Sequence, residues 1–197
     1  MDVLEAIAGR RSVKKFADTR VEDEKLRKIA QAALWAPSGQ NLQPLRLWMI
    51  RDRERIAKIE GEVYRFGLKL KRLRPLIQLF AGDLRGAKGK RVFKSLKEQL
   101  FNGAPVLVMT GADPKESTTY RIDCTLAAQN IQLAAHGLGL GSCYVGWAKL
   151  AGRLPALRRE LKIPPGVEIV DGVVIGYPAG PRGAPKRKEL DEVTTWL

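Results

Sequence analysis

Hydrophobic residues recur along the chain in two kinds of pattern. A helical spacing, with every third or fourth position apolar, covers residues 3–8, 22–36, 53 to Pro75 and 119–136. Short apolar runs typical of strands cover residues 45–50, 105–110, 142–147 and 167–176, and a short helix is expected near 154–161. The pattern predicts an α+β fold with about four strands and five or six helices.

Polar residues and prolines mark where several of these elements begin and end. Asp2 followed by Glu5 forms a capping-box pattern, and Gly9 is expected to end the first helix. Acidic residues at 22–24 suit the positive end of the second helix, which Pro37 closes. Because no repeat or linker divides the chain, we expect a single domain over residues 1–197.

Positive charge is concentrated in two segments of the chain. The formal net charge is +14, and residues 65–97 hold eleven Lys or Arg and one Asp. Residues 182–188 hold four more cations and no acid, so the rest of the chain is neutral. Two basic segments on a neutral body indicate anionic partners, such as a cofactor phosphate, a nucleic acid or an anionic membrane.

Composition disfavours several kinds of chemistry. The apolar runs are too short for a membrane span, and the acidic start does not form a signal-peptide pattern, so a cytoplasmic protein is expected. One histidine and two cysteines disfavour a His/Cys metal site and a catalytic triad. Cys124 and Cys143 are expected to be small buried residues, and His136 to stabilise a helix end. An organic cofactor, or none, is expected.

Arg10, Ser12 and Lys14 share one face if residues 10–14 are extended. A guanidinium, a hydroxyl and an ammonium in a row suit an anion such as a phosphate, although a solvated basic turn explains the same residues. The tail at 182–188, with Lys186 and Arg187, could likewise close over a phosphate or remain a solvated tail.

Polar and glycine-rich loops form two further motifs. The loop 37–44 carries Ser, Gln, Asn and Gln between two prolines, which suits a heteroaromatic ring but also an ordinary turn. The glycines at 137, 139 and 141 end a helix and lead into a strand, which is the reverse of a dinucleotide-binding fingerprint. They indicate a close turn beside a flat ligand, or simply the end of the helix.

Five segments form an ordered set of motifs along the chain. They lie at residues 7–16, 36–44, 104–106, 123–142 and 175–178, with Arg187 beyond the last. In this order and at these distances they resemble the nitroreductase family of FMN-dependent oxidoreductases, over nearly the whole chain. Leu45 replaces an aromatic residue that often follows the second motif, and residues 75–97 match no pattern of the family.

The resemblance implies a nitroreductase-like fold. This is a central, mostly antiparallel sheet of about four or five strands flanked by helices, in an intertwined homodimer with FMN at the interface. Arg10, Ser12 and the region of Lys186 and Arg187 would hold the FMN phosphate, Arg11 would lie near it, and Lys14 would be a catalytic cation at the pyrimidine edge. The other implied cofactor contacts are Pro37, Ser38, Gly39 and Asn41 from the second subunit, and the backbone of Leu140, Gly141 and Ser142.

The resemblance also implies a reaction. NADH or NADPH would reduce FMN and leave, and a nitroaromatic, quinone or similar flat acceptor would follow in a ping-pong mechanism. One histidine suffices, because a flavin accepts hydride without a protein acid or base. Two other functions stay open: a protein that binds nucleic acid or an anionic surface, and a specialised flavoenzyme without nitroreductase activity. Few aromatic residues accompany the basic insert at 65–97, so nucleic acid is disfavoured.

Overall fold

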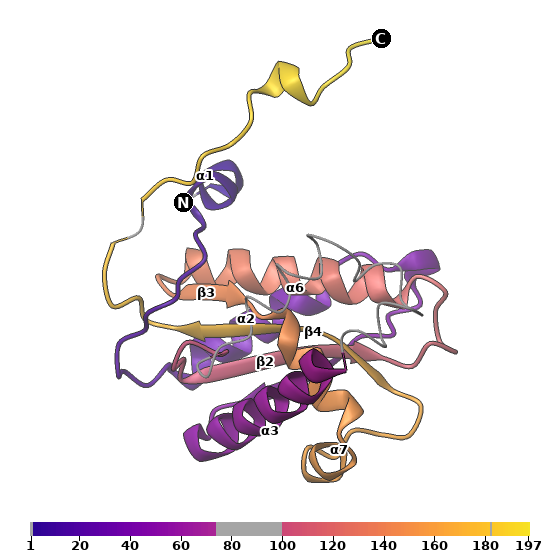
Figure 1. Ribbon diagram of the computed structural model, residues 1–197. Helices are drawn as coiled ribbons and strands as arrows, with labels where there is room; N and C mark the ends of the chain where they lie inside the picture. Colours follow the sequence, from indigo (N-terminus) through magenta and orange to yellow (C-terminus); the bar gives the residue numbers. More distant parts are fainter. Residues whose placement is uncertain (1, 74–99, 182) are drawn as a thin grey trace.

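A computed structural model describes residues 2–73, 100–181 and 183–197 of the chain (Figure 1). The α-helices are α1 (Val3–Gly9), α2 (Asp23–Leu34), α3 (Arg53–Arg72), α6 (Tyr120–Gly137) and α7 (Pro155–Glu160). The strands are β1 (Arg46–Ile50), β2 (Val106–Ala112), β3 (Gly141–Tyr144) and β4 (Glu168–Gly176). Short 3₁₀ segments are η1 (Gly39–Asn41), η3 (Gly146–Arg153) and η4 (Leu190–Glu192). These elements confirm the predicted α+β class.

The four strands form one antiparallel sheet in the order β1-β2-β4-β3. The central strands β2 and β4 pair from Val106↔Ile175 to Ala112↔Glu168, and a bulge lies between Thr110 and Gly111. Every residue of β2 is buried, as expected for a strand covered on both faces. The predicted mostly antiparallel sheet is confirmed for the described residues.

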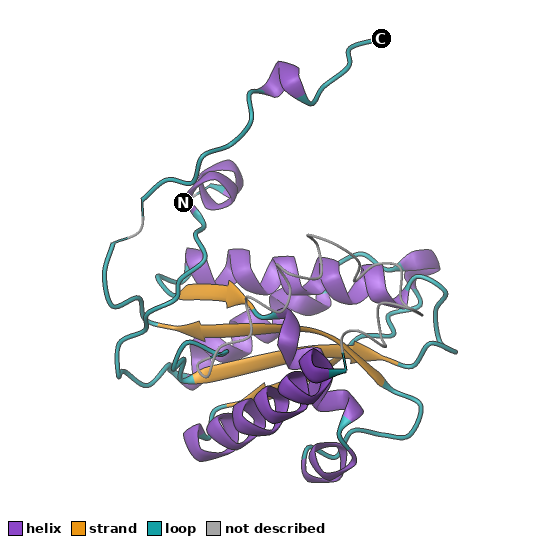
Figure 2. Cartoon of the chain, viewed as in Figure 1, coloured by secondary structure: helices purple, strands orange, loops and turns teal. Residues whose placement is uncertain are grey.

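Helices cover both faces of the sheet, as Figures 1 and 2 show. On one face α2 and α6 pack over an apolar core that includes Ile29, Ile131 and Ile175. On the other face α3, η3 and α7 pack over a second core that includes Ile59, Phe101 and Met109. Ala127 and Ala128 of α6 are buried on the first of these two faces, where their small side chains let the helix pack closely on the sheet.

Most predicted element ends lie within two residues of the observed ends, but one strand was predicted too long. The run 142–147 was expected to be a strand, whereas β3 ends at Tyr144 and η3 begins at Gly146. Gly172 of β4 explains the change, because a Cβ at this position would lie 2.3 Å from the Cβ of Ala148. The missing side chain lets the chain leave the sheet and pack η3 directly on β4.

The start of α1 follows the predicted capping box. The Glu5 backbone N–H donates to Asp2 Oδ1 at 2.9 Å, and the Asp2 N–H donates to Glu5 Oε2 at 3.0 Å. The helix ends at Gly9, but none of its residues is buried. In Figure 1, α1 and the C-terminal tail both extend away from the layered body.

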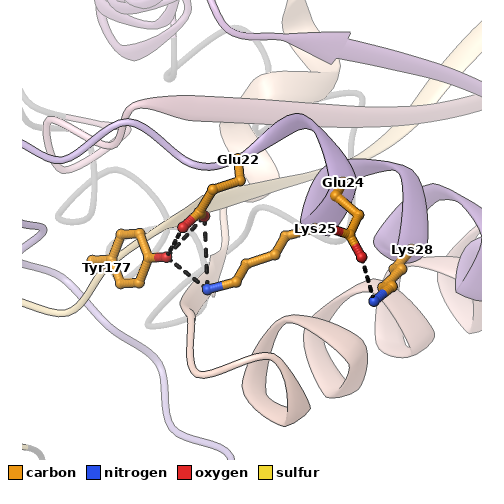
Figure 3. A network of polar contacts seen from close by, with 5 residues as sticks. All are labelled: Glu22, Glu24, Lys25, Lys28 and Tyr177. Carbon is orange, nitrogen blue, oxygen red and sulfur yellow. Dashed lines mark hydrogen bonds and ion pairs between the residues drawn. The ribbon is translucent and has the colours of Figure 1, made fainter.

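A polar network joins the end of β4 to the start of α2 (Figure 3). Lys25 Nζ donates to the Tyr177 hydroxyl at 2.6 Å, and this hydroxyl donates to Glu22 Oε1 at 2.7 Å. Lys25 also lies 4.9 Å from the Tyr177 ring centre. These bonds lower the pKa of Glu22 and raise that of Lys25, with Tyr177 as the main cause of both shifts. Both shifts favour the charged forms in the folded protein.

We expect Tyr177→Phe to destabilise the protein at pH 7, with a smaller effect at pH 3.5. The lowered pKa of Glu22 means that its contribution is present above its ordinary pKa of 4.5 and is lost as pH falls through the folded value. The measurement is urea unfolding of both proteins at each pH. An equal stability difference at the two pH values would contradict the role of Glu22.

No helix among the described residues is both long and apolar enough to cross a membrane. The predicted basic insert, residues 65–97, is described only as far as residue 73, where it forms the end of α3. Its remaining part lies outside the described residues. The basic residues Lys69, Lys71 and Arg72 form the last turn of α3, where cations suit the negative end of a helix.

Candidate functional site

The segment that follows α1 crosses the end of the sheet in an extended conformation. Ser12 forms a parallel bridge with Ser142 of β3, and the Val13 N–H donates to the Ser142 carbonyl at 2.9 Å. Phe16 forms an antiparallel bridge with Pro178, just beyond β4. Val13 is buried while Ser12 and Lys14 are exposed, which confirms the predicted alternation of this segment.

The glycine turn after α6 lets this segment approach β3. Gly139 has a φ of 75°, and the Leu140 N–H donates to the Ala135 carbonyl at 2.8 Å, which closes the helix. A Cβ at Gly141 would lie 2.6 Å from Val13 Cγ2. Gly141 is therefore needed for close approach, and the motif is a turn rather than a dinucleotide fingerprint.

Arg10 and Arg11 lie half-buried at this junction. Arg10 Nη1 donates to Gln132 Oε1 of α6 at 3.4 Å. Arg11 Nη1 donates to the Arg10 carbonyl at 3.0 Å and also to the Ala8 carbonyl. These contacts use only part of each guanidinium, which carries five N–H donors. The remaining donors can bind an anion.

A pocket of about 240 Å³ lies between this segment and the glycine turn. It is lined by Gly9, Arg10, Arg11, Val13, His136, Leu140, Gly141, Ser142, Pro178, Gly180 and Pro181. The Ser142 side chain is 2% exposed, and its hydroxyl has no hydrogen-bond partner within the described part of the chain. A buried hydroxyl without a partner is costly, so a bound group that accepts or donates a hydrogen bond there fits the site.

The donors around this pocket fit a phosphorylated cofactor. Arg10 and Arg11 supply two guanidinium groups and Ser142 a hydroxyl, and a phosphate accepts hydrogen bonds from both kinds of donor. Ser12 does not line this pocket, although its backbone pairs with Ser142. The pocket is smaller than the usual 300–1,000 Å³ of a cofactor site, so one chain encloses only part of such a ligand. The residues present therefore fit FMN, with the rest of the molecule outside this pocket.

The polar loop 37–44 has an unusual backbone. Gln40, Asn41 and Gln43 have φ angles of 51°, 56° and 50°, in the left-handed region that non-glycine residues rarely adopt. The Gln43 N–H donates to Ser38 Oγ at 3.0 Å, which closes the loop on itself. Such backbone strain persists where surrounding contacts hold it, and it is concentrated at ligand-binding sites.

The predicted tail contacts do not meet the strip of Arg10, Arg11 and Ser12 within one chain. Lys186 and Arg187 are exposed, and the one hydrogen bond recorded for them among the described residues joins Arg187 Nη1 to the Lys186 carbonyl at 3.4 Å. In Figure 1 this part of the tail extends away from the sheet. Within one chain, Arg187 therefore does not line the pocket that contains Arg10.

Two polar residues of α6 belong to the site and were not singled out in the sequence. Gln132 is buried and holds Arg10, and Asp123 is buried and accepts from the Gly39 N–H at 3.3 Å. Both stand among the small apolar residues of a helix that faces the sheet. A polar residue on such a face is the signal that could have identified them.

A larger pocket lies elsewhere and is less suited to an anion. Its volume is about 730 Å³, and its lining includes Arg20, Arg51 and Arg53. Asp23 pairs with both Arg20 and Arg51, and Asp18 pairs with Arg53. Since each of these guanidinium groups already pairs with a carboxylate of the chain, the smaller pocket beside Ser142 is the better candidate.

The cysteines and the histidine occupy the places expected of structural residues. Cys124 and Cys143 are both buried, and no disulfide joins them. Burial raises the pKa of the Cys124 thiol to about 12, which keeps the thiol protonated and unreactive. His136 lies in the last turn of α6, and its ring packs against Gly9 of α1. The described residues contain no group of His, Cys, Asp and Glu that could hold a metal ion.

The chain is similar in sequence and in fold to known nitroreductases. The family model described as "Nitroreductase family" matches residues 7–177. A relative in Methanothermobacter thermautotrophicus, whose name includes NAD(P)H nitroreductase, is 34% identical over 182 residues, covering 91% of this chain and 78% of the relative. The chloronitrobenzene nitroreductase of Comamonas testosteroni is 30% identical, covering 97% of this chain and 95% of the relative.

A solved structure agrees with the sequence comparison. The nitroreductase with bound FMN from Desulfitobacterium hafniense DCB-2 is 27% identical and covers 100% of both chains, with a TM-score of 0.78. The segments that resembled the family in sequence are those that the fold brings to the end of the sheet or to the loop beside α6. By the family model, the relatives and the fold, this chain belongs to the nitroreductase family.

Proposed function

We propose that the protein is an FMN-dependent oxidoreductase that passes electrons from NADH or NADPH to a nitroaromatic, a quinone or a similar flat, electron-poor acceptor. The observation that carries the proposal is the buried Ser142 hydroxyl without a described partner, in a pocket lined by Arg10 and Arg11. Relatives named as an FMN reductase, an NADPH-flavin oxidoreductase and nitroreductases support the same chemistry.

In this proposal each segment of the site has its own task. Arg10, Arg11 and Ser12 hold the phosphate, and Ser142 and the backbone at Leu140 and Gly141 lie along the ring. When bound, FMN supplies reversible two-electron chemistry, for which no acid–base pair of the protein is needed. Donor and acceptor then use the same space in turn, which gives ping-pong kinetics.

Lys14 is proposed as the residue that stabilises negative charge at the pyrimidine edge of the reduced cofactor. Replacing Lys14 by alanine is expected to lower the midpoint potential of the bound flavin by about 30–60 mV. This shift corresponds to about 1.5–3 kcal/mol for a hydrogen bond to a charged group. The measurement is redox titration of the two proteins, with exposed Lys28→Ala as the control. An unchanged potential in Lys14→Ala would remove Lys14 from the mechanism.

The site is proposed to be completed by a second copy of the chain. The apolar face of α1, with Val3, Leu4 and Ile7, is exposed, and a helix of seven residues is not stable without packing. Ile122 and Leu126 of α6 are also exposed, as is Trp196 near the end of the tail. In a homodimer these surfaces cover one another, and Pro37, Ser38, Gly39 and Asn41 reach the partner's cofactor. Lys186 and Arg187 can then approach the phosphate site of the partner subunit, since they do not reach the one in their own chain.

We expect sedimentation to give a species of twice 21.9 kDa. A charge on the exposed α6 face, Leu126→Glu, is expected to shift the protein toward the monomer and to release FMN with it. The control is Arg27→Glu at an exposed position of α2. It changes the net charge by more than Leu126→Glu does, but it removes no apolar contact. A monomer that keeps FMN at the affinity of the parent protein would contradict the shared site.

The function is tested first by the colour of the purified protein. We expect a flavin absorbance spectrum that bleaches when NADH or NADPH is added without oxygen, and that recovers when menadione or nitrobenzene is added. Steady-state rates with both acceptors should give the parallel lines of a ping-pong mechanism. A colourless protein that takes up no FMN would refute the proposal. A yellow protein inactive with both acceptors would favour the specialised flavoenzyme.

A further inference from the structure

Asp123 is a buried carboxylate in the first turn of α6, directly beneath the polar loop 37–44. Its side chain is 5% exposed. Oδ1 accepts from the Gly39 N–H at 3.3 Å, and Oδ2 accepts from the Ser117 hydroxyl at 3.0 Å and the Thr119 hydroxyl at 3.2 Å. One carboxylate therefore joins the loop, the turn before α6 and α6 itself. Hydrogen bonds to an ionised acceptor are stronger than bonds between neutral groups.

Packing alone does not hold the loop in place. A cavity of about 90 Å³ lies beneath it, lined by Ala33, Leu34, Ala36, Pro37, Ser38, Gln43, Pro44, Leu45 and Asp123. Gln40, Asn41 and Gln43 are exposed, so they contribute little buried surface. Their left-handed backbone angles are nevertheless unfavourable. The loop therefore depends on its polar contacts. One of these is the hydrogen bond that the Gly39 N–H donates to Asp123.

The turn at residues 116–119, which carries two of the partners of Asp123, is itself held in place. Arg46, at the start of β1, donates to both carboxylate oxygens of Glu116, at 2.8 Å and 2.5 Å. The Thr119 N–H donates to Ser117 Oγ at 3.1 Å. A Cβ at Gly39 would lie 2.4 Å from Thr119 Oγ1, so the glycine allows the loop to come this close. The carboxylate thus connects a fixed turn to a loop that has few other restraints.

We propose that Asp123 is a positioning residue that holds the loop 37–44 in the conformation that meets the cofactor of the partner subunit. The carboxylate does not touch the cofactor. It acts through Gly39, Ser117 and Thr119, and it sets the directions of the Ser38 and Asn41 side chains. This inference rests on the proposed function, because the loop's ligand is FMN.

The test compares Asp123→Ala and Asp123→Asn in the full-length protein. Hydrogen exchange measured by mass spectrometry follows residues 38–43, and a fluorescence titration follows FMN affinity. We expect Asp123→Ala to exchange at least tenfold faster in the loop and to bind FMN at least tenfold more weakly. In Asp123→Asn, the loop exchange rate and the FMN affinity should both lie within about threefold of those of the parent protein. Its amide oxygen can still accept from Gly39, and its NH₂ can donate to a hydroxyl.

A second pair of variants keeps the test valid if Asp123→Ala does not fold. Thr119→Val removes one hydroxyl donor to Asp123, and Thr125→Val removes the hydroxyl that donates to Asp171 at 2.8 Å on the same helix. We expect faster loop exchange and about threefold weaker FMN binding in Thr119→Val but not in Thr125→Val.

Equal loop exchange and equal FMN affinity in Thr119→Val and Thr125→Val would overturn the inference. Failure of Asp123→Asn to recover the loop, while the global unfolding midpoint is normal, would overturn it as well. If the parent protein itself binds no FMN, the proposed function fails. The loop exchange rates still decide whether Asp123 positions the loop.

Discussion

Replacing Arg10 by alanine is expected to weaken FMN binding about ten- to hundredfold. A guanidinium that donates to a phosphate forms charge-assisted hydrogen bonds worth roughly 1.5–3 kcal/mol. Gln132 orients Arg10 from the buried side, and the guanidinium needs no rearrangement to face the pocket. The measurement is a titration of the FMN-free protein with FMN, in which the loss of flavin fluorescence reports binding.

The matched control for Arg10→Ala is Arg27→Ala, which removes the same charge at an exposed position of α2 that does not line the pocket. Because exposed charges are screened over about 8 Å at physiological salt, this control should change FMN affinity less than twofold. Equal affinities of Arg10→Ala and the parent protein would mean that the phosphate is held elsewhere.

Gly141→Ala is expected to destabilise the protein by about 1–3 kcal/mol and to weaken FMN binding more than tenfold. The new methyl group would lie 2.6 Å from Val13 Cγ2 and 2.9 Å from Val13 Cβ, so Val13 must shift and a change of its rotamer alone does not relieve the clash. Relief requires the segment at 10–14 to move away from β3, which separates Ser12 from Ser142. Urea unfolding measures the stability, and the FMN titration measures the site.

Gly137→Ala is the control for Gly141→Ala. A Cβ at Gly137 meets nothing within 4 Å, and alanine favours a helix more than glycine does. We therefore expect the stability of Gly137→Ala to equal or exceed that of the parent. Adding Val13→Ala to Gly141→Ala should recover part of the lost stability and part of the lost FMN affinity. If Gly141→Ala were as stable as Gly137→Ala, the close approach at Val13 would not matter.

The sequence predicted the elements well because their patterns are local. The buried run at 105–110 and the periodic helix at 119–136 carry their own signals, and both are observed. The end of β3 was missed because it depends on Gly172, which lies far along the chain and gives Ala148 a place to pack. A local pattern of apolar residues does not contain that contact.

The candidate site was predicted only as separate segments. The resemblance placed Arg10, Ser12 and Ser142 together, and the structure brings Arg10 and Ser142 to one pocket, with Ser12 paired to Ser142 beside it. It did not identify Gln132 or Asp123, since their roles depend on which segments of the chain lie against α6. The left-handed angles of Gln40 and Asn41 were also not predicted, because these residue types do not require them.

The order in which the chain is synthesised bears on when this pocket can exist. Ser12 pairs with Ser142, and Phe16 pairs with Pro178, so this segment closes against residues far along the chain. Contacts between such distant residues form slowly, because a long loop must close before they stabilise anything. A nascent chain cannot form the pocket until Pro178 has left the ribosome. The N-terminal segment therefore waits unpaired until then, and uptake of cofactor can begin only after residue 178 has emerged.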